Sequence, residues 1–346
     1  MPESGEAQVD VIAVAGACAQ ERSSCARDVA QARGFVLVPA EQTGQGLEAV
    51  DRAVNLVRSA SGVRGLVLEY PFAVPVMEIV GSLTAQAAGT RLVDLICVLD
   101  AADMLTDLAS EEFVRLPMTD DAHDSGVIAS RAELLLAQIE FASTIAVVNA
   151  RALQPEALEQ VTSLVSQLAP CAAQSLIAHP CELHGRSGAT YSQKPPNAGW
   201  VSVLNEEHPH RGSCGVSAVR YEQYRPFHPG RLLHALNTCL FQGHCGHILR
   251  SAGFARLATR PHIIAQWDQV GAIFTLSPVA LDDSLGVGDE LLAFGQDLAF
   301  IGTGIDEIRL RRVLDDAALS DAELAAGPMV WADFPDEFPA WSSASM

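Results

Sequence analysis

The sequence predicts an α/β protein in which a parallel-sheet domain is followed by a smaller α+β domain. Three observations support this fold class. The 346 residues, 49% of them hydrophobic, are enough to fill two ordinary cores. Short β-rich runs alternate with helical patterns in the first half of the chain, which is typical of βαβ units. A polar, irregular stretch then separates that half from a second series of strands and helices.

The first half contains five apolar runs that are short enough and β-rich enough to be strands, at 9–15, 34–38, 65–69, 92–99 and 144–149. Helical spacing of apolar residues predicts helices at 130–141 and 155–168, and the second begins at Pro155, a position where proline is well tolerated. These elements form the predicted domain 1–184.

Residues 185–214 are rich in Gly, Ser, Pro and His, and we expect them to be a linker. Beyond them, the pattern predicts strands at 216–221, 264–274 and 298–301, with helices at 229–240 and 305–314. Strands and helices in this order indicate a second, α+β domain at 215–346.

The net charge of −20 argues against DNA binding, because a phosphate backbone is held by a surplus of Lys and Arg. No apolar run reaches the roughly 20 residues needed to cross a bilayer, and the first residues are polar and acidic, unlike a signal peptide. We therefore expect a cytoplasmic protein that does not enter a membrane. The eight cysteines include no CxxC pair, so we expect thiols rather than disulfides.

The charge is unevenly spread along the chain. Residues 211–260 contain seven arginines and one glutamate, a net charge of +6, whereas the chain after residue 280 is strongly acidic. Two interpretations stay open: the two stretches pair with each other inside one domain, or the basic stretch is a docking surface for a protein or, locally, for ribosomal RNA. For docking, the candidate residues are Arg225, Arg231 and Arg250.

Ordered blocks of sequence in the second domain carry a family resemblance. YRPFHPGRL at 224–232, ILRSAGFARLATRP at 248–261 and QWDQVG at 266–271 are followed by LAFIGTGIDEIRLRRVLDDAALSDAEL at 298–324 and FPAW at 338–341. Together they resemble the CobW C-terminal domain over essentially all of residues 215–341. This resemblance implies a CobW-like protein, a family in which a P-loop GTPase domain precedes that domain.

The first domain resembles the GTPase domain of the same family. LVLEYPFAVP at 66–75 is similar to its Walker B region, and VLDA at 98–101 and QIEFASTIAVVN at 138–149 are similar to segments between that region and the guanine motif. The resemblance implies a P-loop fold whose nucleotide-binding positions are Gly16, Arg22, Ser23, Ser24, Glu69 and Asn149.

Three motifs that the resemblance implies are altered. The family P-loop reads GxxGxGKTT, in which backbone N–H groups and a lysine hold the phosphates, but this chain has GACAQERSS at 16–24, with Glu21 and Arg22 at the glycine and lysine positions. The guanine motif NKxD is NARA at 149–152, and 38–47 lacks the GCxCC metal motif. We expect a degenerate P-loop domain that binds GTP and Mg²⁺ weakly, with weak or no hydrolysis; whether it is an enzyme stays open.

Histidines and cysteines gather in and around the linker, at a point where CobW-like proteins often carry a His-rich stretch. Their ligand types suit zinc, but the spacing HxCxxH is not a standard zinc signature. A polar linker is also a natural place for exposed histidines. Zinc ligation and simple exposure both stay open for His179, Cys181, His184, His208, His210 and Cys214.

Two other histidine-containing segments have simpler interpretations. His244, Cys245 and His247 precede a strand-like stretch, and we expect them to be a spacer. His228 lies between two prolines that favour an extended backbone, so we expect it to be a polar partner at a turn rather than a catalytic base.

Two functions agree with these patterns. The first is a CobW-like protein of zinc homeostasis, in which a nucleotide state controls delivery or retention of a metal. The second is a pseudo-GTPase adaptor that keeps the two-domain shape as a protein-binding surface. The sequence is similar to actinobacterial CobW-like paralogues with weakened P-loops, which are linked to zinc-limited ribosomes and recruit a hibernation factor. That resemblance implies a protein partner and ribosome association.

Overall fold

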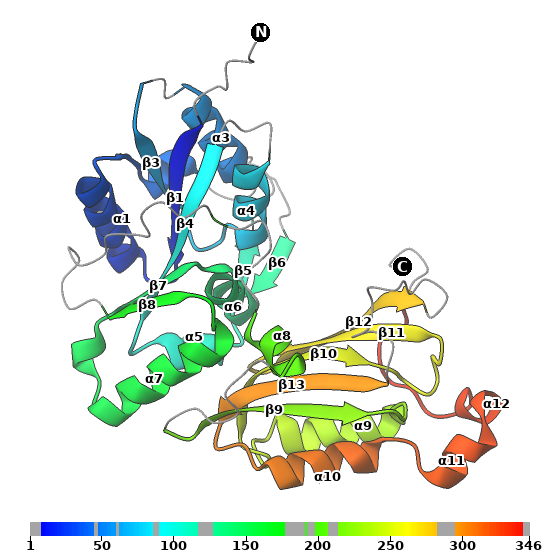
Figure 1. Cartoon of the computed structure of the whole chain (residues 1–346). Helices are drawn as coiled ribbons and strands as arrows, with labels where there is room; N and C mark the ends of the chain where they lie inside the picture. Colours follow the sequence, from blue (N-terminus) through cyan, green and yellow to red (C-terminus); the bar gives the residue numbers. More distant parts are fainter. Residues whose placement is uncertain are drawn as a thin grey trace. The chain divides into compact units, whose positions relative to one another are not determined.

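The chain folds into two compact units, Met1–Ala198 and Gly199–Met346. The structure is a computed structural model (Figure 1), and it describes residues 8–44, 48–59, 62–85, 90–116, 127–176, 191, 198–206, 214–281 and 295–341. Most of the predicted linker therefore lies outside the described residues. Among the described residues, no helix is both long enough and apolar enough to cross a membrane.

The first unit contains a six-stranded parallel sheet with the order β2-β3-β1-β4-β7-β8 (Figure 1). Its strands are β1 Val9–Gly16, β2 Val36–Val38, β3 Gly65–Glu69, β4 Thr90–Asp100, β7 Thr144–Val148 and β8 Ala173–Leu176. Its helices are α1 Ala19–Arg33, α2 Ala40–Thr43, α3 Glu48–Ser59, α4 Val76–Thr84, α5 Met104–Leu108, α6 Arg131–Phe141 and α7 Pro155–Leu168. A separate antiparallel ribbon joins β5 Phe113–Leu116 to β6 Val127–Ser130.

Strand β1 is buried on both faces of this sheet, because successive side chains of a strand point to opposite sides. Val11 and Ala13 join a core with residues of α3 and α4, whereas Ile12 and Val14 join a core with residues of α1. Helices thus cover both faces, as the alternating sequence pattern predicted. In open α/β sheets of this kind, ligands bind beyond the carboxyl ends of the strands.

The second unit contains a five-stranded antiparallel sheet with the order β12-β11-β10-β13-β9. Its strands are β9 Val216–Gln223, β10 His247–Ala255, β11 Ile263–Val270, β12 Ile273–Leu281 and β13 Gln296–Thr303. Its helices are α8 Gly199–Leu204, α9 Pro229–Ala235, α10 Glu307–Ala317, α11 Asp321–Ala326 and α12 Pro328–Trp331, and a π-helical turn at Leu236–Leu240 follows α9. The predicted α+β class is confirmed.

One core fills the space between this sheet and helices α9 and α10. Trp267 of β11 is fully buried there, and its ring meets Phe274 edge-on at a centroid distance of 4.8 Å. The prediction of a single strand at 264–274 was wrong, because Gly271 adopts a left-handed φ of 55° and turns the chain between β11 and β12. Gly271 is the one turn signal inside this run, and the prediction passed over it.

Strands β10 and β13 approach each other closely at Gly302. A Cβ atom at this position would lie 2.1 Å from the carbonyl oxygen of His247, a backbone atom that cannot move aside. At Gly230 in α9, by contrast, the nearest heavy atom would be 3.5 Å away, an ordinary contact. Both glycines lie in the second unit, which also contains all four tryptophans of the chain, at 200, 267, 331 and 341.

We expect Gly302→Ala to lower the free energy of unfolding of the second unit by about 1–3 kcal/mol, because the added methyl group forces the strands apart. Gly230→Ala should change it by no more than about 0.5 kcal/mol. Urea unfolding followed by tryptophan fluorescence measures both. Equal stability of the two variants would show that the strands are not packed this closely.

Candidate functional site

The segment that resembles a P-loop connects β1 to α1 at the carboxyl edge of the parallel sheet. Gly16 ends β1 with φ at 146°, and a Cβ there would lie 2.3 Å from the carbonyl oxygen of Val98, so only glycine fits without strain. Cys18 is the N-cap of α1, and its carbonyl accepts from the Arg22 N–H at 2.9 Å. Ser23 and Ser24 follow, both half-buried.

Arg22, which the sequence resemblance aligns with the P-loop lysine, makes its side-chain contacts inside the unit. Its Nε donates to Oε1 of Glu69 at 3.1 Å, and its Nη1 donates to the Gly16 carbonyl at 2.8 Å. The side chains of Arg22 and Glu69 are only 6% and 2% exposed. The guanidinium charge is therefore neutralised by the protein's own carboxylate.

Glu69, at the end of β3, is hydrogen-bonded through both carboxylate oxygens. Ser23 Oγ donates to Oε1 at 2.6 Å, and the Ala40 N–H at the start of α2 donates to Oε2 at 3.3 Å. The Glu69 carbonyl also accepts from Thr43 Oγ1 at 2.9 Å. One carboxylate thus joins α1, α2 and β3. Hydrogen bonds bring together four of the six predicted nucleotide-site residues, Gly16, Arg22, Ser23 and Glu69, and Ser24 follows Ser23 in α1.

Asn149 lies just beyond β7, which ends at Val148 rather than at residue 149. It adopts a left-handed conformation, with φ at 56°, and its Nδ2 donates to Oδ2 of Asp100 at 2.6 Å. The other oxygen of Asp100 accepts from the Ala102 N–H at 2.9 Å. Asn149 therefore fixes the loop after β4, and Asp100 is a partner that the sequence analysis did not name.

A small cavity of about 150 Å³ opens beside this loop. Asp100, Asp103 and Asp107 line it with a single cation, Arg131, whose Nε lies 2.9 Å from Oδ1 of Asp107. The cavity also includes Cys18 from the P-loop-like segment. Three carboxylates and one paired guanidinium make its lining net negative, which disfavours an anion such as a phosphate.

The cysteines near this loop are held as thiols. Burial, together with the charge of Glu21, raises the pKa of Cys18 to about 11, and burial together with Asp28 raises the pKa of Cys25 to about 12. Burial also raises the pKa of Cys97 well above its usual range. Since the thiolate is the metal ligand and the nucleophile, these three side chains suit packing rather than chemistry.

The predicted zinc ligands fall mostly outside the described residues. This applies to His179, Cys181, His184, His208 and His210, whereas Cys214 is described and exposed at the start of the second unit. Within the described ranges, no three His, Cys, Asp or Glu side chains are placed to hold a metal ion. Zinc ligation by the linker residues stays a prediction.

All three predicted docking arginines make contacts inside the second unit. Arg225 Nη2 lies 2.5 Å from Oδ1 of Asp321, and its Nη1 donates to the Leu319 carbonyl at 3.1 Å. Arg250 is 4% exposed and pairs with Asp268 on the neighbouring strand. Arg225 therefore pairs with the acidic stretch after residue 280, whereas the partner of Arg250 precedes that stretch.

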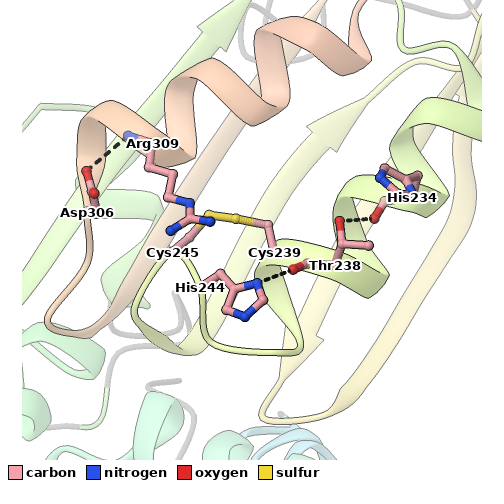
Figure 2. The surroundings of a disulfide bond; sticks show 7 residues. All are labelled: His234, Thr238, Cys239, His244, Cys245, Asp306 and Arg309. Carbon is pink, nitrogen blue, oxygen red and sulfur yellow. Dashed lines mark hydrogen bonds between the residues drawn. A yellow bond between two sulfur atoms is a disulfide. The ribbon is translucent and has the colours of Figure 1, made fainter.

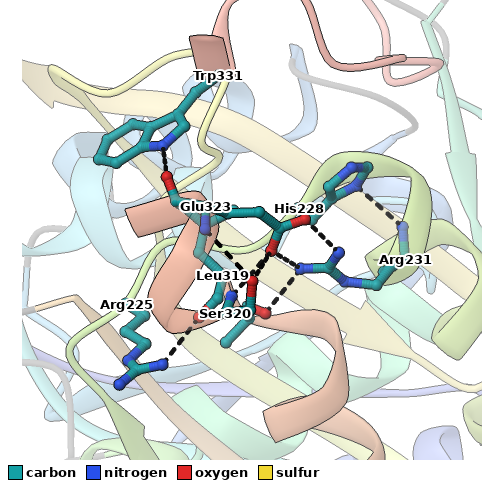
Figure 3. A network of polar contacts seen from close by, with 8 residues as sticks. Arg225, His228, Arg231, Leu319, Ser320, Glu323 and Trp331 are labelled. Carbon is teal, nitrogen blue, oxygen red and sulfur yellow. Dashed lines mark hydrogen bonds and ion pairs between the residues drawn. The ribbon is translucent and has the colours of Figure 1, made fainter. Parts of the chain in front are cut away.

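Arg231 forms the best-defined of these pairs (Figure 3). Two of its nitrogens lie 2.8 Å from the two carboxylate oxygens of Glu323, and Nη2 also donates to the Ala318 carbonyl at 2.9 Å. Glu323 closes a capping box with Ser320 at the start of α11. The hydrogen bonds from Arg231 are the main reason why the pKa of Glu323 lies well below its usual range.

His228 is the N-cap of α9, and its Nδ1 accepts from the Arg231 N–H at 3.4 Å. Its ring stacks on Phe334 with the centroids 4.5 Å apart. Partial burial, and then the charge of Arg231, lowers its pKa, although Glu323 acts in the opposite direction. The histidine is thus a polar partner at a turn.

The expectation that every cysteine is a thiol was wrong. Cys239 and Cys245 form a disulfide, six residues apart and with Cα atoms separated by 5.6 Å. The spacing CxxxxxC spans a helix end and a loop, and it resembles no standard pairing pattern. The π-helical turn that brings the two residues together has no signature in the sequence.

Residues 216–318, which run from β9 to the end of α10, match the model of the cobalamin synthesis protein cobW C-terminal domain. The second unit contains a CobW C-terminal domain. Over 287 residues the chain is also 25% identical to Zinc-regulated GTPase metalloprotein activator 1 of Dictyostelium discoideum. That similarity covers 75% of this chain and 58% of the relative, so the chain spans less than two thirds of that protein and the similarity extends beyond the CobW C-terminal domain.

Two solved structures are similar over 90% of this chain and 99% of their own. They are Zn(II)-bound YjiA GTPase from E. coli, with 11% identity and a TM-score of 0.34, and a Zn(II)-bound triple mutant of YjiA GTPase, with 10% identity and a TM-score of 0.38.

The buried ion pair of the first unit allows a test by substitution. We expect Arg22→Met to lower the free energy of unfolding by about 3–5 kcal/mol, because it leaves the Glu69 carboxylate buried without its counter-charge. Adding Glu69→Met should recover much of that loss, since no unpaired charge then remains. Urea unfolding followed by circular dichroism measures the cycle.

The matched control for this cycle is Arg91→Met, which breaks the pair with Asp10 on the same sheet. That pair is more exposed, with side chains 44% and 26% accessible, and we expect a cost of at most about 1 kcal/mol. If Arg22→Met proved as mild as Arg91→Met, the buried pair would not hold the segment together.

The low pKa of Glu323 predicts how the second unit responds to acid. Its carboxylate is stabilised in the folded state. Its contribution to the free energy of unfolding is therefore complete above the pKa of the unfolded state, 4.5, and is lost as the pH falls below that value. Glu323→Gln should therefore reduce the fall in Tm between pH 6 and pH 3.5, measured by tryptophan fluorescence. Glu337→Gln, an exposed control, should behave as wild type; an equal effect of both would contradict this role for Glu323.

Proposed function

We propose that this chain is a CobW-like protein of zinc homeostasis whose nucleotide site is closed by its own side chains and has weak or no GTP hydrolysis. One observation carries the proposal: Arg22, at the position of the phosphate-binding lysine, is buried against Glu69 and the Gly16 carbonyl. A guanidinium that is already neutralised offers little to a triphosphate. Lys194, the only lysine of the chain, lies far along the sequence.

The residues around this segment fit a triphosphate with its Mg²⁺ poorly. Glu21 adds a carboxylate in the first turn of α1, where bound phosphates would lie, and like charges at such distances repel. Ser23 and Glu69, which could otherwise assist a metal ion, are bonded to each other. The aspartate-lined cavity beside the loop adds further negative charge. We therefore derive no hydrolytic step through these residues.

The zinc part of the proposal is supported by similarity and by ligand chemistry. The Dictyostelium relative is named as a zinc-regulated GTPase metalloprotein activator, and its name supports a zinc-linked role and a protein target for this chain as well. The His and Cys residues of the linker are of the types that zinc prefers.

A second candidate is a pseudo-GTPase adaptor that recruits a protein partner, such as a ribosome hibernation factor under zinc limitation. The observation that favours it is the intact parallel sheet around a phosphate site filled by its own side chains. Docking through Arg225, Arg231 and Arg250 would then have to tolerate, or replace, their contacts inside the CobW C-terminal domain.

Calorimetric titration of the metal-stripped protein with magnesium GTP, with and without zinc, tests the proposal. We expect no micromolar binding in either condition, because the cation of the phosphate segment is already paired. The variant Glu21→Gly/Arg22→Lys, which restores the glycine and the lysine, should bind GTP more tightly than wild type.

Micromolar GTP binding by the wild-type protein would contradict the proposal that the site is closed. If zinc increased the affinity for GTP, the protein would instead be a metal-coupled switch. Zinc binding without GTP binding would agree with a role in zinc homeostasis in which GTP takes no part. If neither ligand bound, the adaptor function would be favoured.

A further inference from the structure

The disulfide between Cys239 and Cys245 lies at the edge of the CobW C-terminal domain, where α9 runs through a π-helical turn into the loop before β10 (Figure 2). Among the described residues, Cys18, Cys25, Cys97, Cys171 and Cys214 are not in a disulfide. Cys239 and Cys245 thus differ from the other described cysteines. The bond is therefore a local feature that calls for an explanation of its own.

A purely stabilising role explains this pair poorly. In the chain-entropy model, a disulfide stabilises a fold by restricting the unfolded chain, and its effect grows with the length of the loop that it closes. Cys239 and Cys245 are only six residues apart, so the loop is short. Both residues also lie in a well-packed apolar core that holds this helix end in place without a covalent bond.

Arg309, His244 and the acidic Asp306 all lie in the surroundings of the disulfide. Figure 2 shows Arg309 extending from the first turn of α10 toward the disulfide, with the ring of His244 on the loop between the two cysteines. Nδ1 of His244 lies 2.7 Å from the Thr238 carbonyl, which fixes the ring beside the π-helical turn. A cation such as the Arg309 guanidinium near a disulfide favours exchange, because positive charge stabilises the thiolate that leaves when a disulfide is attacked.

The loop is mechanically connected to the start of α10. The Cys245 carbonyl accepts from the Asp306 N–H at 3.1 Å, and Asp306 caps α10 by accepting from the Arg309 N–H at 3.0 Å. Gly246, with φ at 97°, packs so closely that a Cβ there would lie 2.4 Å from the Gly304 carbonyl oxygen. A change in the loop therefore reaches the cap of α10 directly.

We propose that Cys239–Cys245 is a reversible thiol–disulfide switch that controls the order of the 241–246 loop and of the first turn of α10. A dithiol reductant of the thioredoxin or dithiothreitol class attacks one sulfur as a thiolate and displaces the other, and its second thiol then releases the mixed disulfide. The protein gains two electrons and two protons as a pair of thiols, and the reductant becomes a disulfide. The reverse exchange with an oxidised dithiol closes the loop again.

Both cysteines are buried, Cys239 at 4% exposure and Cys245 at 0%, so exchange requires the loop to open. Gly243 and Gly246 both have positive φ, at 71° and 97°, and provide the backbone freedom for this motion. Opening exposes the sulfurs without unfolding the sheet, which is separately held by its strand pairing.

The experiment uses the full chain, equilibrated in dithiothreitol buffers of graded redox potential under native conditions, with alkylation and mass spectrometry to read the state of each cysteine. We expect Cys239 and Cys245 to change state together and reversibly while the protein stays folded. Hydrogen exchange at 241–246 and 304–310 should be faster in the reduced form and in Cys239→Ser/Cys245→Ser than in the oxidised wild type.

Arg309→Gln tests the role of the neighbouring charge. We expect it to slow reduction roughly two- to tenfold, because it removes the cation that stabilises the leaving thiolate. Arg312→Gln, an exposed substitution on the same helix, should leave the rate unchanged. The proposal is wrong if the pair is reduced only when the protein unfolds, or if hydrogen exchange at 304–310 is the same in the oxidised and reduced forms.

Discussion

The ion pair between Arg22 and Glu69 is the constraint on which the first unit depends. Glu69 ends a central strand, and its carboxylate receives hydrogen bonds from α1 and from the start of α2, while Arg22 reaches back to the carbonyl of the last residue of β1. Both charges are buried, so the loss of either partner leaves the other charge buried without a counter-charge or solvent to stabilise it. The contacts that organise the carboxyl edge of the sheet are therefore the same contacts that remove the cation from a potential phosphate site.

The CobW C-terminal domain is organised by a similar principle at its surface. Its arginines lie mainly between residues 211 and 260, and their partners come from later parts of the chain, as in Arg231 with Glu323 and Arg260 with Asp336. Each of these pairs is partly exposed and individually contributes little. Several of these arginines, however, also donate hydrogen bonds to carbonyl groups, so together the pairs fix the acidic helices and the tail to the rest of the domain.

The sequence was sufficient to predict the class of both units and the neighbourhood of Gly16, Arg22, Ser23 and Glu69. The spacing of apolar residues and the ordered sequence blocks each depend on many residues, so one exceptional residue does not alter the predicted fold class. The details that were missed depend on a few backbone angles: the turn at Gly271, the left-handed Asn149 and the π-helical turn that brings Cys239 to Cys245. Likewise, the motif comparison aligns Arg22 with a lysine, but only tertiary packing shows where its side chain is directed.

A phosphate-binding segment can lose its function in two physically different ways. It can lose the groups that bind phosphate, or it can keep a cation that pairs with other groups of the same protein. In the function that we propose, Arg22 is an instance of the second way, because a planar guanidinium can satisfy a carboxylate and a carbonyl at the same time, which a lysine ammonium does with less directional precision. On that proposal, an arginine in place of the lysine does more than weaken phosphate binding, because it gives the fold a buried bond to Glu69. If the free energy of that bond is large, a nucleotide must compete with the structure of the protein itself, and affinity falls even though the positive charge is retained.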